Sequence, residues 1–312
     1  MADWSTDSQE RVASLVYSPK FEKVFCSGAF RLNIPPTYDK YMEWGFTDAS
    51  VRFYHTESKK LIGHNEHIHQ GQLSCAKFAD SKTLITAGTD GAISVWALKS
   101  TAKSVELIHR STLFNHVTPV MTMALSRSFS TLVTASNDLA VSLWDLNRLR
   151  FIRHLPTPSP ITCLSVNDVS GEILLCAGQT ATIFTINGAI LLRQNICESS
   201  EDAIVSCAFY EGFGNEWLER ELVFTGHKRG IVNIWQKRIG KLGGFELLHV
   251  KRLQHVNQFQ SEIVVQAAIT EVLPMPAAVY TGDEMGRVVC PPLFALTFSY
   301  SAFGLNAKSD NG

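Results

Sequence analysis

The sequence predicts an all-β fold built from repeated sheets, and three observations support this prediction. Two segments, His69 to Leu98 and His116 to Leu146, carry the same pattern of apolar and polar residues. Short apolar runs of strand composition recur along the chain, separated by turns rich in Gly, Asp, Asn and Ser. No segment of the sequence keeps the apolar period of about 3.6 residues that a long amphipathic helix needs. A pattern that returns at this interval indicates a repeat architecture.

The repeated pattern consists of four residues at fixed offsets. In both segments a histidine precedes a strand and a threonine lies near the end of the next strand. An aspartate follows the threonine by four residues, and a tryptophan follows the aspartate by six. The two sets are His69, Thr86, Asp90 and Trp96, and His116, Thr134, Asp138 and Trp144. The pattern resembles the WD40 repeat, in which these residue types form a hydrogen-bonded relay within one four-stranded blade of a β-propeller. The resemblance implies a structural role for these eight residues.

Four further copies of the pattern are less complete. Tyr54 and Phe184 take the tryptophan position in two of them, Trp235 restores it in a third, and Ala278 to Cys290 forms the last. Successive steps of 42, 48, 40 and 51 residues from Tyr54 suit blades of this kind joined by variable loops. Six blades can therefore be counted. We expect seven, because Val12 to Ile34 also has strand composition and the two ends of the chain can meet to close the ring.

Length and composition are those of one globular unit. The chain has 312 residues, of which 45% are hydrophobic and 18% charged. We expect residues 11–306 to form the propeller, with a disordered N-terminus (1–10) and a disordered tail (307–312). The formal net charge of −1 argues against a nucleic-acid partner. The apolar segment Pro291 to Leu305 is short for a membrane span.

The cysteines and histidines do not have the spacing of a metal site. The seven cysteines are scattered and none forms a CxxC pair, so we expect reduced, buried thiols in a cytoplasmic protein, with no metal and no cofactor. His64, His67 and His69 lie within six residues and offer an alternative metal site. The relay already assigns His69 to the blade, which leaves only two histidines on the linker.

Segments between the repeats carry a more specific resemblance. Tyr38 to Tyr54, and Val166 to Ile173 with the following Ile186-Asn187-Gly188, are similar to the WD40 region at the C-terminal end of BEACH-domain proteins of the Beige, or lysosomal-trafficking-regulator, type. The resemblance implies a non-catalytic scaffold that binds other proteins through its propeller faces during vesicle and lysosomal membrane traffic. It also implies a BEACH domain in the parent chain, of which this sequence is a fragment, a split gene model or a short paralogue.

Other functions were weighed against this one. The relay contains the residue types of a Ser-His-Asp hydrolase site, but it occurs in two repeats, whereas a catalytic site is expected once; we therefore predict that the chain is not an enzyme. A general WD40 adaptor, such as a ubiquitin-ligase substrate receptor, stays open. A phosphoinositide-binding propeller is disfavoured because the paired-arginine FRRG motif of such propellers does not occur. We expect a cytoplasmic protein with at most peripheral attachment to endomembranes.

One insertion within a repeat is a candidate partner-binding loop. Tyr210 to Arg220 contains Phe213 and Trp217 flanked by acidic residues. These two aromatic side chains suit a lip that binds a peptide, and equally a segment that folds back to cover a blade edge.

Overall fold

The fold is described from a computed structural model of the 312-residue chain. It describes residues 14–17, 24–30, 40–46, 48–56, 58–101, 103–210, 222–241, 243–254, 267–274, 279–284 and 288–289. These residues form strands, turns and loops, and none of them is helical. Within this described part, therefore, no helix is long and apolar enough to cross a membrane.

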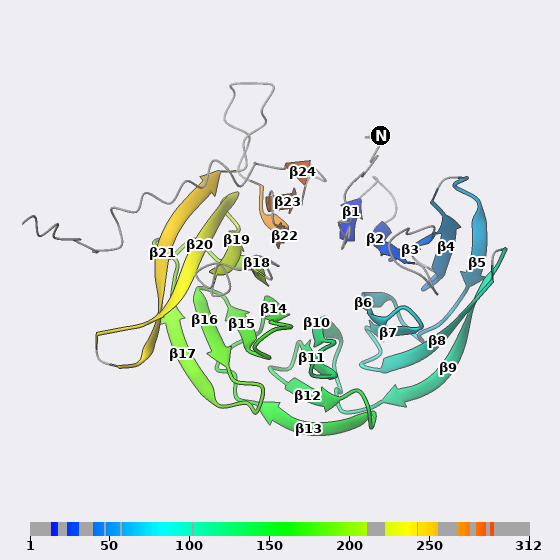
Figure 1. Ribbon diagram of the computed structural model, residues 1–312, viewed down its shortest axis with the longest axis horizontal. Helices are drawn as coiled ribbons and strands as arrows, with labels where there is room; N and C mark the ends of the chain where they lie inside the picture. The colour runs from blue at the N-terminus through cyan, green and yellow to red at the C-terminus, as the bar shows by residue number, and fades with distance from the viewer. Residues whose placement is uncertain are drawn as a thin grey trace, which may run out of the picture.

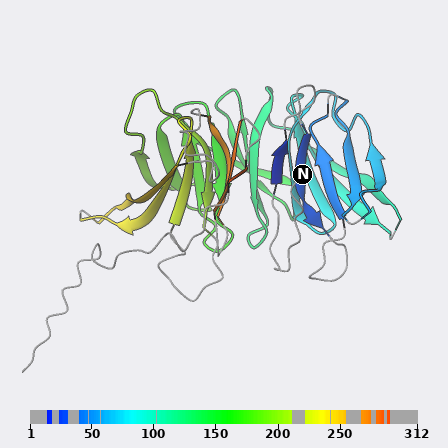
Figure 2. The same cartoon turned by 90° about the horizontal axis from the view of Figure 1, so that it is seen from above.

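The strands assemble into six sheets that follow one another around a central axis (Figure 1). Within each sheet the strands lie in chain order and pair antiparallel. Seen from the side, the sheets stand next to one another and their strands run between two loop-bearing faces (Figure 2). This arrangement confirms the predicted all-β propeller with six countable blades. We number the blades 1 to 6 in chain order.

The bounds of the blades follow the sequence copies. Blade 1 comprises β1 (Ser14–Tyr17), β2 (Val24–Phe30), β3 (Lys40–Trp44), β4 (Val51–His55) and β5 (Leu61–Asn65). Blade 2 comprises β6 (Leu73–Asp80), β7 (Thr83–Gly88), β8 (Ile93–Ser100) and β9 (Val105–Leu113). Blade 3 comprises β10 (Val120–Ser126), β11 (Thr131–Ser136), β12 (Val141–Asp145) and β13 (Arg150–Leu155).

The second half of the chain continues in the same order. Blade 4 comprises β14 (Cys163–Val166), β15 (Ile173–Ala177), β16 (Thr180–Phe184) and β17 (Ile190–Asn195). Blade 5 comprises β18 (Ile204–Phe209), β19 (Leu222–His227), β20 (Ile231–Ile239) and β21 (Phe245–Gln254). Blade 6 comprises β22 (Ile269–Pro274), β23 (Val279–Asp283) and β24 (Val288–Val289).

The N-terminal strands do not form a blade of their own. β1 pairs with β2, and β2 pairs with β3 through partners such as Phe25 and Trp44, so both strands belong to blade 1. The stretch Val12 to Ile34, which we expected to contribute to a seventh blade, instead supplies the inner strands of the first one. A seventh sheet is not among the described residues, and the seven-bladed ring stays a prediction.

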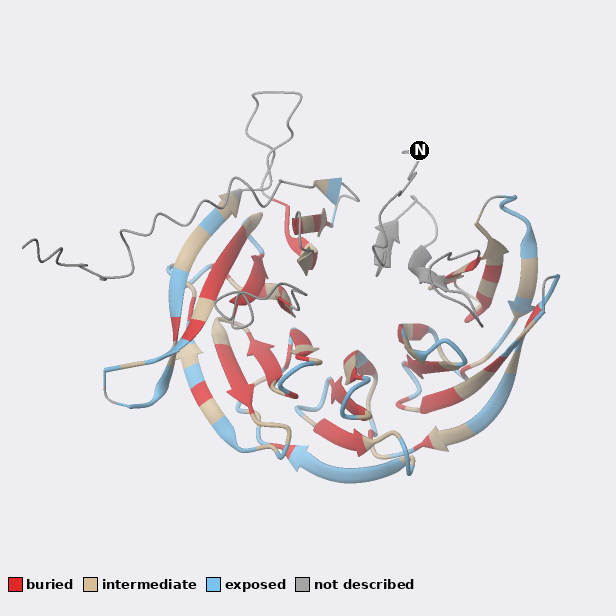
Figure 3. Ribbon diagram, viewed as in Figure 1, coloured by how far each residue is buried: buried red, intermediate tan, exposed pale blue. Residues whose placement is uncertain are grey.

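The core of the protein lies between neighbouring blades. The second strands of blades 3, 4 and 5 are covered on both faces, since every residue of β11, β15 and β19 is buried (Figure 3). The outermost strand faces solvent, as β13 does along most of its length. Each apolar cluster joins adjacent blades: Val133 of blade 3 packs in one cluster with Leu175 of blade 4, and Phe224 of blade 5 with Val272 of blade 6. Burial on both faces explains why the second strands read as continuous apolar runs.

A β-bulge marks the tryptophan position in blades 1 to 5. In each of these blades the register between the last two strands shifts immediately before that position. The shifts fall between Phe53 and Tyr54, Val95 and Trp96, Leu143 and Trp144, Ile183 and Phe184, and Ile234 and Trp235. Tyr54 and Phe184 therefore stand where the sequence copies place them, although neither is a tryptophan.

Candidate functional site

Threonine and tryptophan form the constant part of the relay in three blades. The indole Nε1 donates a hydrogen bond to a threonine Oγ1 at 2.8 Å in each pair. The pairs are Trp96 with Thr86, Trp144 with Thr134, and Trp235 with Thr225. All three threonines are fully buried. Because a buried indole N–H needs an acceptor, the hydroxyl fixes the ring against the second strand.

In blade 2 the relay is complete. His69 Nε2 lies 2.9 Å from Thr86 Oγ1, and His69 Nδ1 lies 3.1 Å from Asp90 Oδ1. Since a carboxylate only accepts, Nδ1 donates to Asp90 and Nε2 accepts from the threonine hydroxyl. Asp90 also accepts from the backbone N–H groups of Gln70 and Ala92 at 3.0 and 3.1 Å. The four residues form one chain of bonds from the turn to the indole.

In blade 3 the same four residues are present but the chain is interrupted. His116 Nε2 lies 2.7 Å from Thr134 Oγ1, whereas the buried His116 Nδ1 has no hydrogen-bond partner. Asp138 instead accepts a hydrogen bond from the Ala140 N–H at 3.1 Å. Burial raises the pKa of Asp138, but this bond and the nearby hydroxyls of Ser136 and Thr118 outweigh it and hold the pKa below its ordinary value. The structure therefore does not bring His116 and Asp138 together as the sequence pattern implies.

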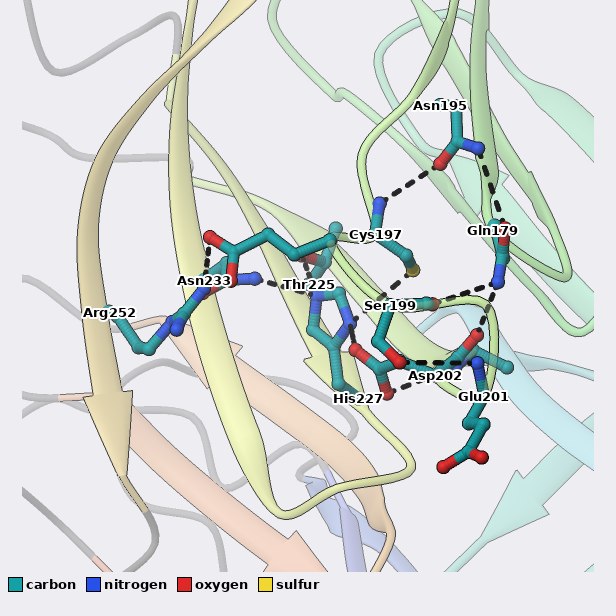
Figure 4. A network of polar contacts seen from close by, with 12 residues as sticks. Gln179, Asn195, Cys197, Ser199, Glu201, Asp202, Thr225, His227, Asn233 and Arg252 are labelled. Carbon is teal, nitrogen blue, oxygen red and sulfur yellow. Dashed lines mark hydrogen bonds and ion pairs between the residues drawn. The ribbon is translucent and has the colours of Figure 1, made fainter.

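In blade 5 the relay is rebuilt from different positions. His227, at the end of β19, places Nε2 2.9 Å from Thr225 Oγ1 and Nδ1 2.9 Å from Asp202 Oδ2 (Figure 4). The histidine thus comes from the second strand, and the aspartate comes from the loop between β17 and β18. In blade 2 the histidine lies on the loop before the first strand, and the aspartate follows the second strand. Burial lowers the pKa of His227, and Asp202 partly opposes that shift. The repeat pattern does not reveal this pair, because the position four residues after Thr225 holds Arg229 and not an aspartate.

Blades 1 and 4 lack the relay and replace it differently. In blade 4, Leu175 pairs with Thr182 as Thr86 pairs with Ser94, so an apolar residue takes the threonine position in the blade that carries Phe184. A phenyl ring has no N–H to donate, which makes the hydroxyl unnecessary. In blade 1, Glu43 takes the threonine position and pairs with Arg52 across the strands, and burial raises its pKa above the ordinary value although Arg52 opposes the shift.

The relays are unsuited to catalysis. A hydroxyl, an imidazole and a carboxylate lie in series in blade 2, as in a hydrolase triad. However, Thr86 Oγ1 already binds both Trp96 and His69, and Thr86 is fully buried, so no substrate can reach it. We conclude that the geometry serves the blade and gives no positive sign of catalysis.

The histidine-rich linker does not gather into a metal site. Both ring nitrogens of His69 are engaged by Thr86 and Asp90, and His69 is buried. His64 Nδ1 lies 3.5 Å from Glu66 Oε1, and His67 is exposed. Phe213 and Trp217, the two aromatic residues of the candidate binding loop, lie outside the described residues, so their role stays a prediction.

Three distant cysteines do come together. The Sγ atoms of Cys163, Cys176 and Cys207 all lie within 4.8 Å of one another. Cys163 and Cys176 face each other on β14 and β15, and Cys207 comes from β18 of the next blade. The spacing of these residues in the sequence carries no signal of this grouping, because only the packing of blade 4 on blade 5 creates it.

Exposed apolar side chains collect on the loops at one end of blade 3. Phe114 and Val117, between β9 and β10, are 77% and 91% exposed, and Met121 at the start of β10 is 52% exposed. Leu139, in the turn between β11 and β12, is 41% exposed. The two loops are joined by a hydrogen bond of 3.2 Å from Asn137 N to Pro119 O. We call Phe114, Val117, Met121 and Leu139 the blade 3 apolar loop group.

Comparison with known families agrees with this geometry. Residues 56–97 and 108–145 match the family described as WD domain, G-beta repeat. These two stretches cover most of blades 2 and 3, in which the four-residue pattern is fully kept. Together with the six blades, the match defines the chain as a WD40 β-propeller.

Individual relatives show which WD40 proteins this chain is similar to. The chain is 34% identical to BEACH domain-containing protein A2 of Arabidopsis thaliana over 69% of its own length. It is 27% identical over 89% of its length to Beige protein homolog 1 of Schizosaccharomyces pombe. It is 32% identical over 65% of its length to WD repeat- and FYVE domain-containing protein 4 of Homo sapiens. It spans only 6%, 11% and 6% of these three proteins, respectively. The chain is thus a WD40 propeller region homologous to the BEACH-domain proteins, as the sequence resemblance predicted.

Proposed function

We propose that this chain is a non-catalytic scaffold that acts in vesicle and lysosomal membrane traffic and binds a partner protein through the blade 3 apolar loop group. It would work as the C-terminal WD40 part of a BEACH-type protein, in the cytoplasm and attached to endomembranes only peripherally. The observation that carries the proposal is the exposed apolar loop group on a rigid blade. Homology to the BEACH-domain proteins supports the place of action.

Single exposed apolar residues are common on protein surfaces and need no explanation, whereas a group of them on two hydrogen-bonded loops does. Phe114 and Val117 lie on either side of His116 in the sequence. The His116 ring is buried and bound to Thr134, so this hydrogen bond anchors the loop that carries them to blade 3. A group of apolar side chains held out into solvent on a fixed loop is the typical centre of a protein-binding surface.

The backbone of Leu139 supports the same reading. Its φ angle is 69°, in the left-handed region. The corresponding turn positions of blades 2 and 5 are Gly91 and Gly230, with φ of 76° and 73°. A leucine in this conformation costs about 1–2 kcal/mol relative to glycine. A strained and exposed leucine in place of glycine is consistent with selection for contact rather than for stability.

Substitution of Leu139 separates binding from folding. Leu139→Gly removes the apolar side chain and relieves the backbone strain, so the melting temperature should stay equal or rise. Partner binding should fall, and Phe114→Ser should weaken it further. Ile152→Ser, at an exposed apolar position on β13 outside the group, is the matched control. Binding unchanged in both loop variants would exclude this surface.

Proximity labelling in cells, with the same variants, tests the site of action. Recovery of vesicle-fusion or lysosomal proteins by the wild type, lost with Leu139→Gly and kept with Ile152→Ser, is the expected outcome. Recovery of ubiquitin-ligase subunits instead would favour a general WD40 adaptor and contradict the trafficking role.

A further inference from the structure

The cysteine cluster at the junction of blades 4 and 5 has the composition of a metal site. Cys163 begins β14, and its partner across the strand pair is Cys176 on β15. Cys207 approaches from β18, the inner strand of blade 5, where it pairs with Thr225. Cys163 and Cys176 are buried and Cys207 is partly buried. The three thiols therefore lie together in the interior between two blades.

The separation of the sulfur atoms fits a single ion. Three sulfur atoms bound to one Zn²⁺ at about 2.3 Å in tetrahedral geometry lie about 3.8 Å apart. The Sγ atoms here lie within 4.8 Å of one another, so small side-chain rotations bring them to that spacing. Thiolates select soft cations such as Cu⁺ and Zn²⁺ over Mg²⁺ or Ca²⁺.

Blade 2 provides an internal comparison. Cys75 holds the position of Cys163, since it pairs with Ala87 as Cys163 pairs with Cys176. Alone in the core, Cys75 has its pKa raised to about 12 by burial. Blade 2 thus holds one buried thiol where the junction of blades 4 and 5 groups three, which makes Cys75 the matched control for the cluster.

We propose that Cys163, Cys176 and Cys207 bind a thiophilic d¹⁰ cation, Cu⁺ or Zn²⁺, between blades 4 and 5. A set of three sulfur ligands completes the coordination of Cu⁺, and on Zn²⁺ it leaves a fourth position for water or an anion. Binding releases the thiol protons, and the charge of the cation offsets the cost of burying thiolates. The ion would link the two blades and stabilise the folded state by mass action.

Metal retention by the purified, reduced chain tests the proposal. Apo protein is prepared anaerobically with a chelator, loaded with Zn²⁺ or with Cu⁺ in separate samples, and desalted. Bound metal is then measured by mass spectrometry. We expect the wild type to retain one ion per chain with at least one of the two cations, and to show a higher melting temperature than the apo form. The sample that retains the ion identifies the cation.

Two variants assign the ion to the cluster. Cys176→Ala removes one ligand but should fold, because Ala87 and Ala135 hold the same position in blades 2 and 3. It should lose the ion and the metal-dependent rise in melting temperature. Cys75→Ala, the matched control, should keep both.

X-ray absorption of the loaded wild type gives a readout that needs no variant. A shell of three sulfur atoms at about 2.3 Å is expected. Loss of both ions on desalting, equal retention in Cys176→Ala, or a shell of nitrogen and oxygen would each overturn the proposal.

Discussion

Blades 2 and 3 carry the same four residues, yet only blade 2 completes the relay. His69 contacts both Thr86 and Asp90, whereas His116 contacts Thr134 and leaves its buried Nδ1 without a hydrogen-bond partner. The motif residues are identical, so the cause lies in their neighbours. The pattern therefore specifies the blade, and the residues between the pattern positions specify its hydrogen bonds.

Two small residues make the difference. Gly88 lies two residues after Thr86, and a Cβ atom added there would stand 2.8 Å from His69 Nδ1 and 2.7 Å from Asp90 Oδ1. The corresponding residue in blade 3 is Ser136, whose hydroxyl lies 2.5 Å from the hydroxyl of Thr118. Both hydroxyls lie near enough to Asp138 to lower its pKa. Glycine leaves room for the histidine to meet the aspartate, whereas serine adds a side chain at that position.

Removal of the shared hydroxyl should have the largest effect and should affect both blades alike. Thr86→Val and Thr134→Val each leave a buried indole N–H and an imidazole nitrogen without their partner, at a cost of about 3 kcal/mol. Urea denaturation measures the loss. Thr86→Ser and Thr134→Ser keep the oxygen and should lose much less. A similar loss for serine and valine would mean that the methyl group, not the hydroxyl, stabilises the blade.

Substitution of the glycine should convert blade 2 to the pattern of blade 3. Gly88→Ser places a side chain between His69 and Asp90, and we expect a loss of about 2 kcal/mol, because the buried Nδ1–H loses its acceptor. The signal of the ring proton on His69 Nδ1, followed by NMR, should disappear or shift strongly. Ser136→Ala is the control in blade 3, where no histidine–aspartate bond exists to be broken. A Gly88→Ser protein with an intact Nδ1–H signal would contradict the steric explanation.

The pH dependence of blade 3 should give the smallest effect. Burial lowers the pKa of the His116 imidazole, and Asp138 partly opposes this while His154 adds to it. An unfolded histidine has a pKa of about 6.5, so below that pH the unfolded state binds a proton that the folded state does not. The contribution of the neutral His116 imidazole to the free energy of unfolding is fully present above about pH 6.5. It is lost as the pH falls toward the lower pKa of the folded state, by at most about 1.4 kcal/mol per pH unit.

A variant isolates this contribution from those of other groups. His116→Gln keeps a polar group beside Thr134 but does not titrate. Its stability deficit relative to the wild type, measured by urea denaturation, should shrink between pH 7.5 and 5.5, by no more than about 1.4 kcal/mol. A deficit that stays constant over this range would mean that His116 does not titrate differently in the folded and unfolded states.

Much of the architecture could be predicted from the sequence because a blade has a fixed length. The interval of forty-odd residues located Tyr54 and Phe184 at the tryptophan position, and the structure places the same β-bulge before each of them. The Asp202–His227 pair could not be predicted in this way. Relative to blade 2, the histidine and the aspartate have exchanged places in the sequence. Fixed offsets describe which residue type stands at which position, and they carry no information on the distance between atoms.

The sequence by itself determined the all-β propeller, its six countable blades and its homology to the BEACH-domain proteins. Strand periodicity and repeat spacing are local properties, and local properties can be read along one chain. Only the tertiary structure decided which histidine meets which aspartate, where β1 and β2 pair, and that Cys163, Cys176 and Cys207 lie together. These outcomes depend on close packing between strands and between neighbouring blades, where a single Cβ atom changes the partner of a buried group.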